Sequence, residues 1–429
     1  MVTGNEYIFD NIDLALKYIL DAEQKALMND PYRLKPPLVV RPWLGMFIAP
    51  ATEQIPFIPV DSFDYPFSAW YNSVSDDKFV MTRLMSGRYS LKPNLRNRCY
   101  LFRGESEFHN PCKPNLFRNR KQKRFTAEMV RGQEMKLLML SHPLVQLLDM
   151  GVELDGKLYQ FEMNLFGLTQ HYYNKTSLLD LTSDPEVATF FATTKYDWTN
   201  DSYSPIIDEE HSPGVLYYYI LDVNKDFGKT AGTTSSSLTT IGLQVFPRSG
   251  RQKGFLYDLR RNESFNDVAR VHAVRFKHNA DIAKRICTRY SNGKDLFPED
   301  ILASHWRRDN IDSNVISNRT VLMNKIDNPQ MTLEEVCNEI QSLGFEIRNY
   351  VPSFTVEEME GYYDAVQDYY WPDFCSQIHI PGDREGGMMR DLIALPNNPK
   401  YRWAFEKNDS HVTDFEKGYV MKHYKMCLV

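Results

Sequence analysis

The sequence predicts an α+β fold, because segments typical of strands and helices follow one another without the regular alternation of a doubly wound parallel sheet. Strand-like runs are rich in aromatic and β-branched residues, whereas helical runs carry an apolar stripe of helical period. The expected strands cover residues 98–104, 214–223, 241–247, 254–258 and 268–276. The expected helices cover residues 10–28, 126–148, 161–172, 184–195, 279–290 and 298–308.

Residues that can cap helices mark several of these elements. Asp10 or Asn11 can cap the first helix. Ser183 and Glu186 have capping-box spacing at the start of the helix at 184–195. The same spacing recurs near the C-terminus, at Thr332–Glu335 and Thr355–Glu358.

The length of 429 residues predicts more than one domain. We expect an N-terminal helical and irregular region at 1–94 that packs on a central α+β domain at 95–310. Residues 320–429 are expected to form a small, mainly helical accessory domain.

Charge, hydropathy and cysteine spacing restrict the class of function. The net charge of −6 does not favour binding of the whole chain to nucleic acid or to an anionic membrane. No apolar stretch approaches 18 residues, so we expect no membrane helix. Six cysteines lie far apart and ten histidines lack ligand spacing, which predicts no metal site and a reducing, cytoplasmic location.

One basic run stands out against this acidic background. Arg118–Arg124 carries five cationic residues, flanked by Phe117 and Phe125. The run could contact a nucleic acid or an acidic protein partner. The alternative is a solvated turn that leads into a helix.

Two segments place polar groups where apolar ones are expected. Tyr100–Phe102 reads as a buried strand and runs directly into Arg103 and Gly104. Further along, polar residues surround the apolar pair Leu178–Leu179; they are Gln170, His171, Tyr172, Asp180, Thr182 and Ser183. This crowding predicts either a buried hydrogen-bond network or a ligand pocket.

These segments carry a resemblance to a known family. "YLFRGES", "QHYYNKTSLLDLTSDPEVATFFA", "RQKGF" and "LFPED" occur in the order found in the FRG domain, which is named for its Phe-Arg-Gly motif. The resemblance covers roughly residues 95–305.

A weaker resemblance links the same order of motifs to the arginine-type ADP-ribosyltransferases. Arg103–Gly104, Thr182–Ser183 and Gln252 would stand in for that family's aromatic-Arg-Gly, Ser-Thr-Ser and Gln/Glu-x-Glu segments. The resemblance implies an ADP-ribosyltransferase-like mixed β core with flanking helices that binds NAD as its substrate. It also implies transfer of ADP-ribose or cleavage of NAD, in a toxin or a phage-defence role.

The resemblance assigns roles to individual residues. The nucleotide-binding set is Arg103, Gly104, Gln170, Tyr172, Thr182 and Ser183, and the catalytic set is Gln252, His171 and Asp180. Gln252 carries no charge where the transferases use a glutamate. Either Asp180, Glu105 or Asp258 supplies the acid, or catalysis is weak, or the site only binds a nucleotide.

Two alternatives remain open from the sequence. Arg103 could hold a diphosphate, or it could pair with a buried carboxylate such as Asp180. Correspondingly, the protein could be a nucleotide-consuming enzyme, a nucleotide sensor without catalysis, or a module that binds protein or nucleic acid.

Overall fold

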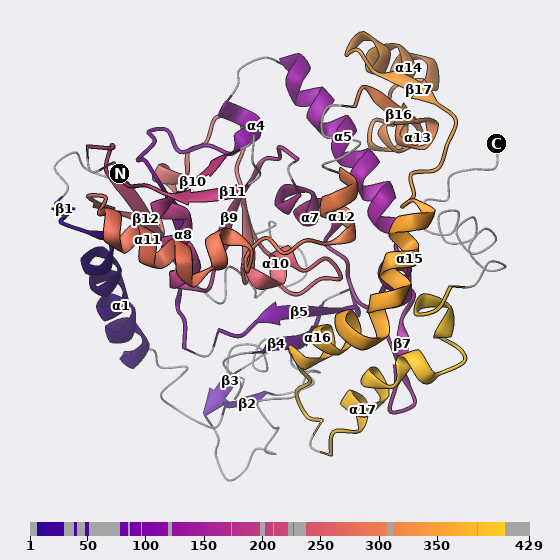
Figure 1. The fold of residues 1–429 in the computed structure, drawn as a ribbon, viewed down its shortest axis with the longest axis horizontal. Helices are drawn as coiled ribbons and strands as arrows, with labels where there is room; N and C mark the ends of the chain where they lie inside the picture. The colour runs from indigo at the N-terminus through magenta and orange to yellow at the C-terminus, as the bar shows by residue number, and fades with distance from the viewer. Residues whose placement is uncertain are drawn as a thin grey trace. The chain divides into compact units, whose positions relative to one another are not determined.

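A seven-stranded mixed sheet organises the first part of the chain (Figure 1). In spatial order its strands are β1 (Ile8–Phe9), β15 (Val271–Phe276), β12 (Gly214–Ile220), β6 (Tyr100–Glu105), β9 (Leu178–Thr182), β14 (Gly254–Asp258) and β13 (Leu238–Thr240). β1 and β15 run parallel, and the other neighbours are antiparallel. The computed structural model therefore confirms a mixed α and β fold.

The structure describes most of the chain, and its contacts divide it into two units. The described residues are 7–29, 38–40, 48–50, 78–84, 86–95, 97–118, 122–172, 174–197, 202–208, 210–221, 226, 237–306, 313–383 and 385–407. Unit 1 comprises Met1–Pro114, Ser177–Pro298 and His379–Gly382, and unit 2 comprises Asn115–Thr176, Glu299–Ile378 and Asp383–Val429. Each unit consists of several separate stretches of the chain. The expected division into continuous domains at 1–94, 95–310 and 320–429 therefore stays a prediction.

The sheet of unit 1 is buried on both faces. On one face, α1 (Ile12–Met28), α8 (Pro185–Thr193) and α11 (Ala280–Arg289) pack against Phe102 and its neighbours. On the opposite face, Leu101, Tyr217 and Phe255 belong to a second apolar cluster. Because successive side chains of a strand point to opposite faces, β6 contributes to both clusters.

The glycine of the Phe-Arg-Gly motif is explained by this packing. A Cβ atom at Gly104 would lie 1.9 Å from the backbone oxygen of Ala188 on α8. Only a residue without a side chain lets this helix approach the strand so closely.

Unit 1 also contains shorter elements around the sheet. They are β2 (Leu38–Val40), β3 (Ile48–Pro50), β4 (Phe79–Arg83), β5 (Tyr89–Pro93), β10 (Thr194–Asp197), β11 (Ser202–Pro205) and α10 (Arg248–Arg251). The strand expected at 241–247 is wrong, because β13 ends at Thr240. Gly242 has a φ of 63°, and this left-handed conformation interrupts an extended chain.

Unit 2 is mainly helical, with two short strand pairs. Its strands are β7 (Val152–Leu154), β8 (Lys157–Tyr159), β16 (Val315–Ser317) and β17 (Glu346–Arg348). Its helices are α4 (Asn115–Arg118), α5 (Gln122–Leu140), α6 (Pro143–Met150), α7 (Leu165–His171), α12 (Ile301–His305), α13 (Asn318–Asp327), α14 (Leu333–Ser342), α15 (Val356–Ala365), α16 (Trp371–Ser376) and α17 (Gly387–Ile393). A single helix over 126–148 is wrong, because Pro143 starts a new helix that His142 caps.

The expected caps have mixed outcomes. Asn11 caps α1, which confirms one of the two expected residues. The capping boxes at Thr332–Glu335 and Thr355–Glu358 are both formed. The expected cap at Ser183 is wrong: Asp184 caps α8, and its carboxylate accepts a hydrogen bond from the backbone of Glu186. Ser183 therefore does not have to serve the helix end.

Among the residues that the structure describes, no helix combines the length and the apolar character that crossing a membrane requires.

Candidate functional site

Arg103 lies in a polar network in the interior of unit 1. Its Nε and Nη2 donate to the same Oε1 of Glu105, at 2.9 and 2.7 Å. Its Nη1 donates to the backbone oxygen of Asp180 at 2.8 Å. Burial, the largest single influence, disfavours the charged guanidinium, but Glu105, Cys112 and Asp180 together outweigh it and raise the pKa of Arg103. The carboxylate partner of Arg103 is thus Glu105, two residues along the same strand.

The other residues of this network are buried beside the sheet. The thiol of Cys112 donates to Glu105 at 3.6 Å. Burial raises the pKa of Tyr217, which belongs to the adjacent strand β12. Among these groups, the Glu105 carboxylate is the one that pairs with the charge of Arg103.

Thr182 and Gln252 join the end of β9 to the turn before β14. The hydroxyl of Thr182 donates to the backbone oxygen of Gln252 at 2.7 Å and accepts from the backbone nitrogen of Asp184 at 2.9 Å. The Gln252 amide donates to the backbone oxygen of Leu296 at 3.1 Å. Both side chains therefore have structural partners in unit 1.

A cleft of about 190 Å³ opens near these residues, at one end of unit 1. It is lined by Lys78, Phe79, Pro93, Asn94, Asn97, Arg98, Ser183, Asp184 and Lys253. The lining comes from the ends of strands β4, β5, β6 and β14 and from the start of α8. Three of these residues are cations, and one is a carboxylate.

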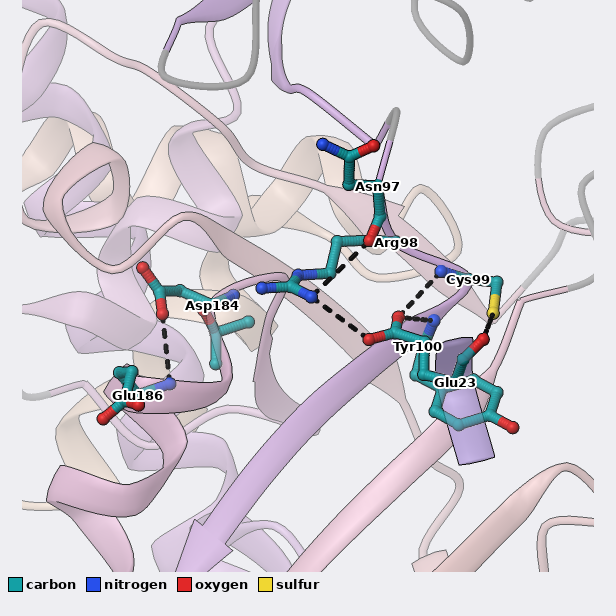
Figure 2. Close-up of polar contacts among 8 residues, drawn as sticks. Glu23, Asn97, Arg98, Cys99, Tyr100, Asp184 and Glu186 are labelled. Carbon is teal, nitrogen blue, oxygen red and sulfur yellow. Dashed lines mark hydrogen bonds and ion pairs between the residues drawn. The ribbon is translucent and has the colours of Figure 1, made fainter. Parts of the chain in front are cut away.

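Two of the cations in the cleft are each held by a carboxylate. Arg98 Nη1 lies 3.2 Å from Oε2 of the buried Glu23, which belongs to α1. Lys253 Nζ lies 3.2 Å from Oδ2 of Asp184. Figure 2 shows Arg98 with Glu23 beside it, and Asp184 at the start of α8. The cleft thus presents positive charge whose position is fixed by neighbouring groups.

The backbone at Lys253 is unusual. Its φ of 46° lies in the left-handed region, which residues with a side chain adopt rarely. Its own carbonyl accepts a hydrogen bond from the backbone nitrogen of Ser183, which fixes the two residues relative to each other. Strained conformations of this kind concentrate at functional sites.

The residues predicted from sequence are distributed over three places. Ser183 lies in the cleft lining. Arg103, Gly104, Asp180, Thr182 and Gln252 also belong to unit 1, but none of them is among the cleft-lining residues. Gln170, His171 and Tyr172 belong to unit 2. The roles of all of these residues in binding or catalysis stay predictions.

Within unit 2, two of the predicted residues make identified hydrogen bonds. The Tyr172 hydroxyl donates to Oδ2 of Asp300 at 2.7 Å. The side chain of Gln170 accepts from the hydroxyl of Thr176 at 2.5 Å. His171 is buried as the last residue of α7.

Two further expectations concern charged groups. Asp258, one of the candidate acids, accepts a hydrogen bond from the Ser177 hydroxyl at 2.7 Å. In the basic run Arg118–Arg124, Arg118 is exposed at the end of α4, while residues 119–121 lie outside the described residues. Partner binding through this run stays a prediction.

Among the cleft residues that sequence reasoning missed are its four charged ones: Lys78, Arg98, Asp184 and Lys253. A weak signal was available, because Lys78, Arg98 and Lys253 each precede a strand by one or two residues. β6 and β14 start at the same edge of the seven-stranded sheet, whereas β4 belongs to a separate three-stranded sheet. The sequence does not show which strands share an edge.

The segment that carries most of these features also matches a known domain. Residues 98–201 match the FRG domain family. The FRG match begins at Arg98 and includes Ser183 and Asp184, whereas Glu23 and Lys253 lie outside it. A search of curated proteins and a search of solved structures found no match.

Proposed function

We propose that the cleft in unit 1 binds the diphosphate end of an NAD-type dinucleotide, and that the protein transfers or releases ADP-ribose from it. The observation that carries the proposal is the cleft itself, whose lining includes Arg98, Lys253 and Lys78 together with Ser183. In this proposal unit 1 is an ADP-ribosyltransferase-like core, and the C-terminal residues form an accessory domain.

The cations suit a diphosphate. A guanidinium can hold two phosphate oxygens at once, and ammonium groups add charge without fixed geometry. The cleft of about 190 Å³ is smaller than the pockets of roughly 300–1,000 Å³ that enclose drug-sized ligands. It therefore accommodates one part of a dinucleotide, with the remainder outside the cleft.

Asp184 offers the negative charge that the chemistry needs. Breaking the bond between nicotinamide and ribose develops positive charge on the sugar, which a nearby carboxylate stabilises. Nicotinamide leaves with the bonding electron pair, and water or an acceptor group then attacks the sugar carbon. Asp184 is the carboxylate of the cleft lining, and its Oδ2 lies 3.2 Å from Lys253 Nζ. In this proposal Asp184 supplies the negative charge that stabilises the sugar cation, which the uncharged Gln252 does not supply.

The test is incubation of the full chain with adenylate-labelled NAD, with and without cell lysate. We expect release of nicotinamide or labelling of an acceptor, and we expect Arg98→Ala to abolish it. Arg285→Ala is the matched control, because Arg285 also pairs with a carboxylate of α1, at 2.7 Å from Asp13. Absence of turnover under all conditions would remove the enzymatic part of the proposal. An NAD-consuming activity would fit a cytoplasmic toxin or a phage-defence effector.

A second candidate is a nucleotide sensor that uses the same cleft without turnover. It is favoured by Gln252, whose amide is engaged with the Leu296 carbonyl and carries no charge. This candidate predicts saturable NAD binding in calorimetry together with no release of nicotinamide. Failure to bind NAD would contradict both candidates.

A further inference from the structure

Glu23 is a buried carboxylate that joins α1 to the start of β6. The residue is 1 % exposed. Its Oε1 accepts hydrogen bonds from the backbone nitrogens of Cys99 and Tyr100, at 2.8 and 2.9 Å. Its Oε2 accepts from Arg98 Nη1 at 3.2 Å (Figure 2).

The charge of Glu23 is not needed for the start of the strand. A neutral amide oxygen would satisfy the two backbone N–H groups equally well in number. Burial of the carboxylate is unfavourable and raises the pKa of Glu23, although Arg98 and the two N–H groups act in the opposite direction. The group that requires a negative charge at this place is therefore the guanidinium of Arg98.

Arg98 contacts Glu23 and also lines the cleft. Its guanidinium pairs with Glu23, and its side chain, which is 33 % exposed, belongs to the cleft lining. A long side chain that is held before the ligand arrives loses less conformational freedom on binding.

We infer that Glu23 is a positioning residue, which holds Arg98 in the cleft for a phosphate-bearing ligand. The inference rests on the proposed function for the identity of the ligand. It extends the site to α1, far outside residues 98–201, which match the FRG domain.

A first experiment tests the positioning without a nucleotide. The full chain is treated with phenylglyoxal, which modifies arginine, and the rate at Arg98 is followed by peptide mass spectrometry. We expect Glu23→Gln to raise the rate at Arg98 several-fold and to leave Arg285 unchanged. The matched control Asp13→Asn should raise the rate at Arg285 and leave Arg98 unchanged. An unchanged rate at Arg98 in Glu23→Gln would overturn the inference.

Loss of folding would not prevent this test. Glu23→Gln keeps an acceptor for the backbone N–H groups, so we expect it to unfold within a few degrees of wild type. If it does not fold, Glu23→Asp keeps the charge with a shorter reach. The same rise in the rate at Arg98 is then expected, and no rise would overturn the inference.

A second experiment measures binding of NAD and of inorganic pyrophosphate by calorimetry. We expect Glu23→Gln to weaken binding about three- to ten-fold, and Arg98→Ala to weaken it by ten-fold or more. If Glu23 acts through Arg98, the double variant binds as Arg98→Ala does. If Glu23→Gln weakens binding by the same factor in Arg98→Ala as it does in the wild type, Glu23 does not act through Arg98, and the inference is contradicted. If the wild type binds neither probe, the proposed function fails, and the phenylglyoxal experiment still decides the role of Glu23.

Discussion

Two arginines five residues apart illustrate how differently one residue type is used in this protein. Arg103 is 14 % exposed and pairs with Glu105 of the same strand, while its remaining group meets the Asp180 carbonyl. Arg98 is 33 % exposed, pairs with Glu23 of a distant helix and lines a cleft. Arg103 thus makes its contacts within the interior of unit 1, whereas Arg98 lines a cleft that a ligand can enter.

The comparison teaches that a buried carboxylate partner does not by itself decide the role of an arginine. Both arginines have one, in Glu105 and Glu23. What differs is the space around the rest of the guanidinium. We therefore expect changes at Arg103 to act mainly on stability and changes at Arg98 to act mainly on ligand affinity.

Removal of the Arg103 charge is the strongest way to test this contrast. Arg103→Met leaves Glu105 buried without its cation, and loss of one partner of a buried pair costs about 3–5 kcal/mol. We expect that loss in the free energy of unfolding, measured with denaturant. The double variant Arg103→Met, Glu105→Leu should recover most of it, because an apolar pair removes both buried charges.

The opposite result would return a ligand role to Arg103. If Arg103→Met unfolds like the wild type but no longer binds NAD, the diphosphate role that the sequence left open for Arg103 would be correct. The contrast with Arg98 would then disappear.

The next largest effect is expected at the glycine beside Arg103. In Gly104→Ala the new methyl group would meet the Ala188 oxygen, so α8 has to shift. Overpacking of this kind costs about 1–3 kcal/mol or more. Thermal unfolding measures the loss.

A second glycine serves as the control. Gly361 lies within α15 with no atom close to a new methyl group, so Gly361→Ala should be neutral or stabilise by up to about 1 kcal/mol. Equal melting temperatures of Gly104→Ala and the wild type would show that α8 does not depend on this glycine.

These examples show what the sequence could reveal. Strand β6, helix α8 and the cap at Asn11 were predictable because each follows from neighbours in the chain. The Arg103–Glu105 pair was accessible by the same logic, since residues i and i+2 share one face of a strand. The sequence instead suggested Asp180, which contributes its backbone oxygen.

The cleft could not be predicted in this way. Glu23 and Arg98 are separated by 75 positions, and Lys78 and Lys253 precede strands of two different sheets. Motif order also grouped Gln170, His171 and Tyr172 with the motif residues; these three belong to unit 2, and their roles stay predictions. Which strand edges meet is a property of packing, and no local pattern encodes it.

The third prediction concerns the cations of the cleft. Arg98→Ala and Lys253→Ala should each weaken NAD binding about ten-fold, which corresponds to about 1.4 kcal/mol. Lys253→Ala should change the free energy of unfolding by less than about 1 kcal/mol, because its pair with Asp184 is partly exposed. Arg98→Ala should cost less than Arg103→Met, because Arg98 is one-third exposed although Glu23 is buried. Calorimetry at two salt concentrations measures the effect, and the affinity of the wild type should fall more steeply with salt. Equal salt dependence in wild type and variants would contradict a phosphate contact.

The smallest expected effect is on the pH dependence of stability and concerns Glu23. Burial, the largest influence, raises the pKa of Glu23 above its ordinary value of 4.5. At pH values between 4.5 and the pKa of Glu23 in the folded protein, the folded protein binds more protons at Glu23 than the unfolded chain does. Its contribution to stability is therefore complete below pH 4.5 and declines as the pH rises through the folded pKa, by at most about 1.4 kcal/mol per pH unit.

Glu23→Gln isolates this contribution, because the amide does not titrate. The unfolding free energy of wild type minus that of Glu23→Gln should fall as the pH rises from about 4.5 toward neutrality. Asp13→Asn should show no comparable fall, since the half-exposed Asp13 pairs with Arg285 at the surface. A difference that rises with pH would mean that Arg98 outweighs burial in setting the charge of Glu23. The pair would then resemble Arg103–Glu105 more closely than its exposure suggests.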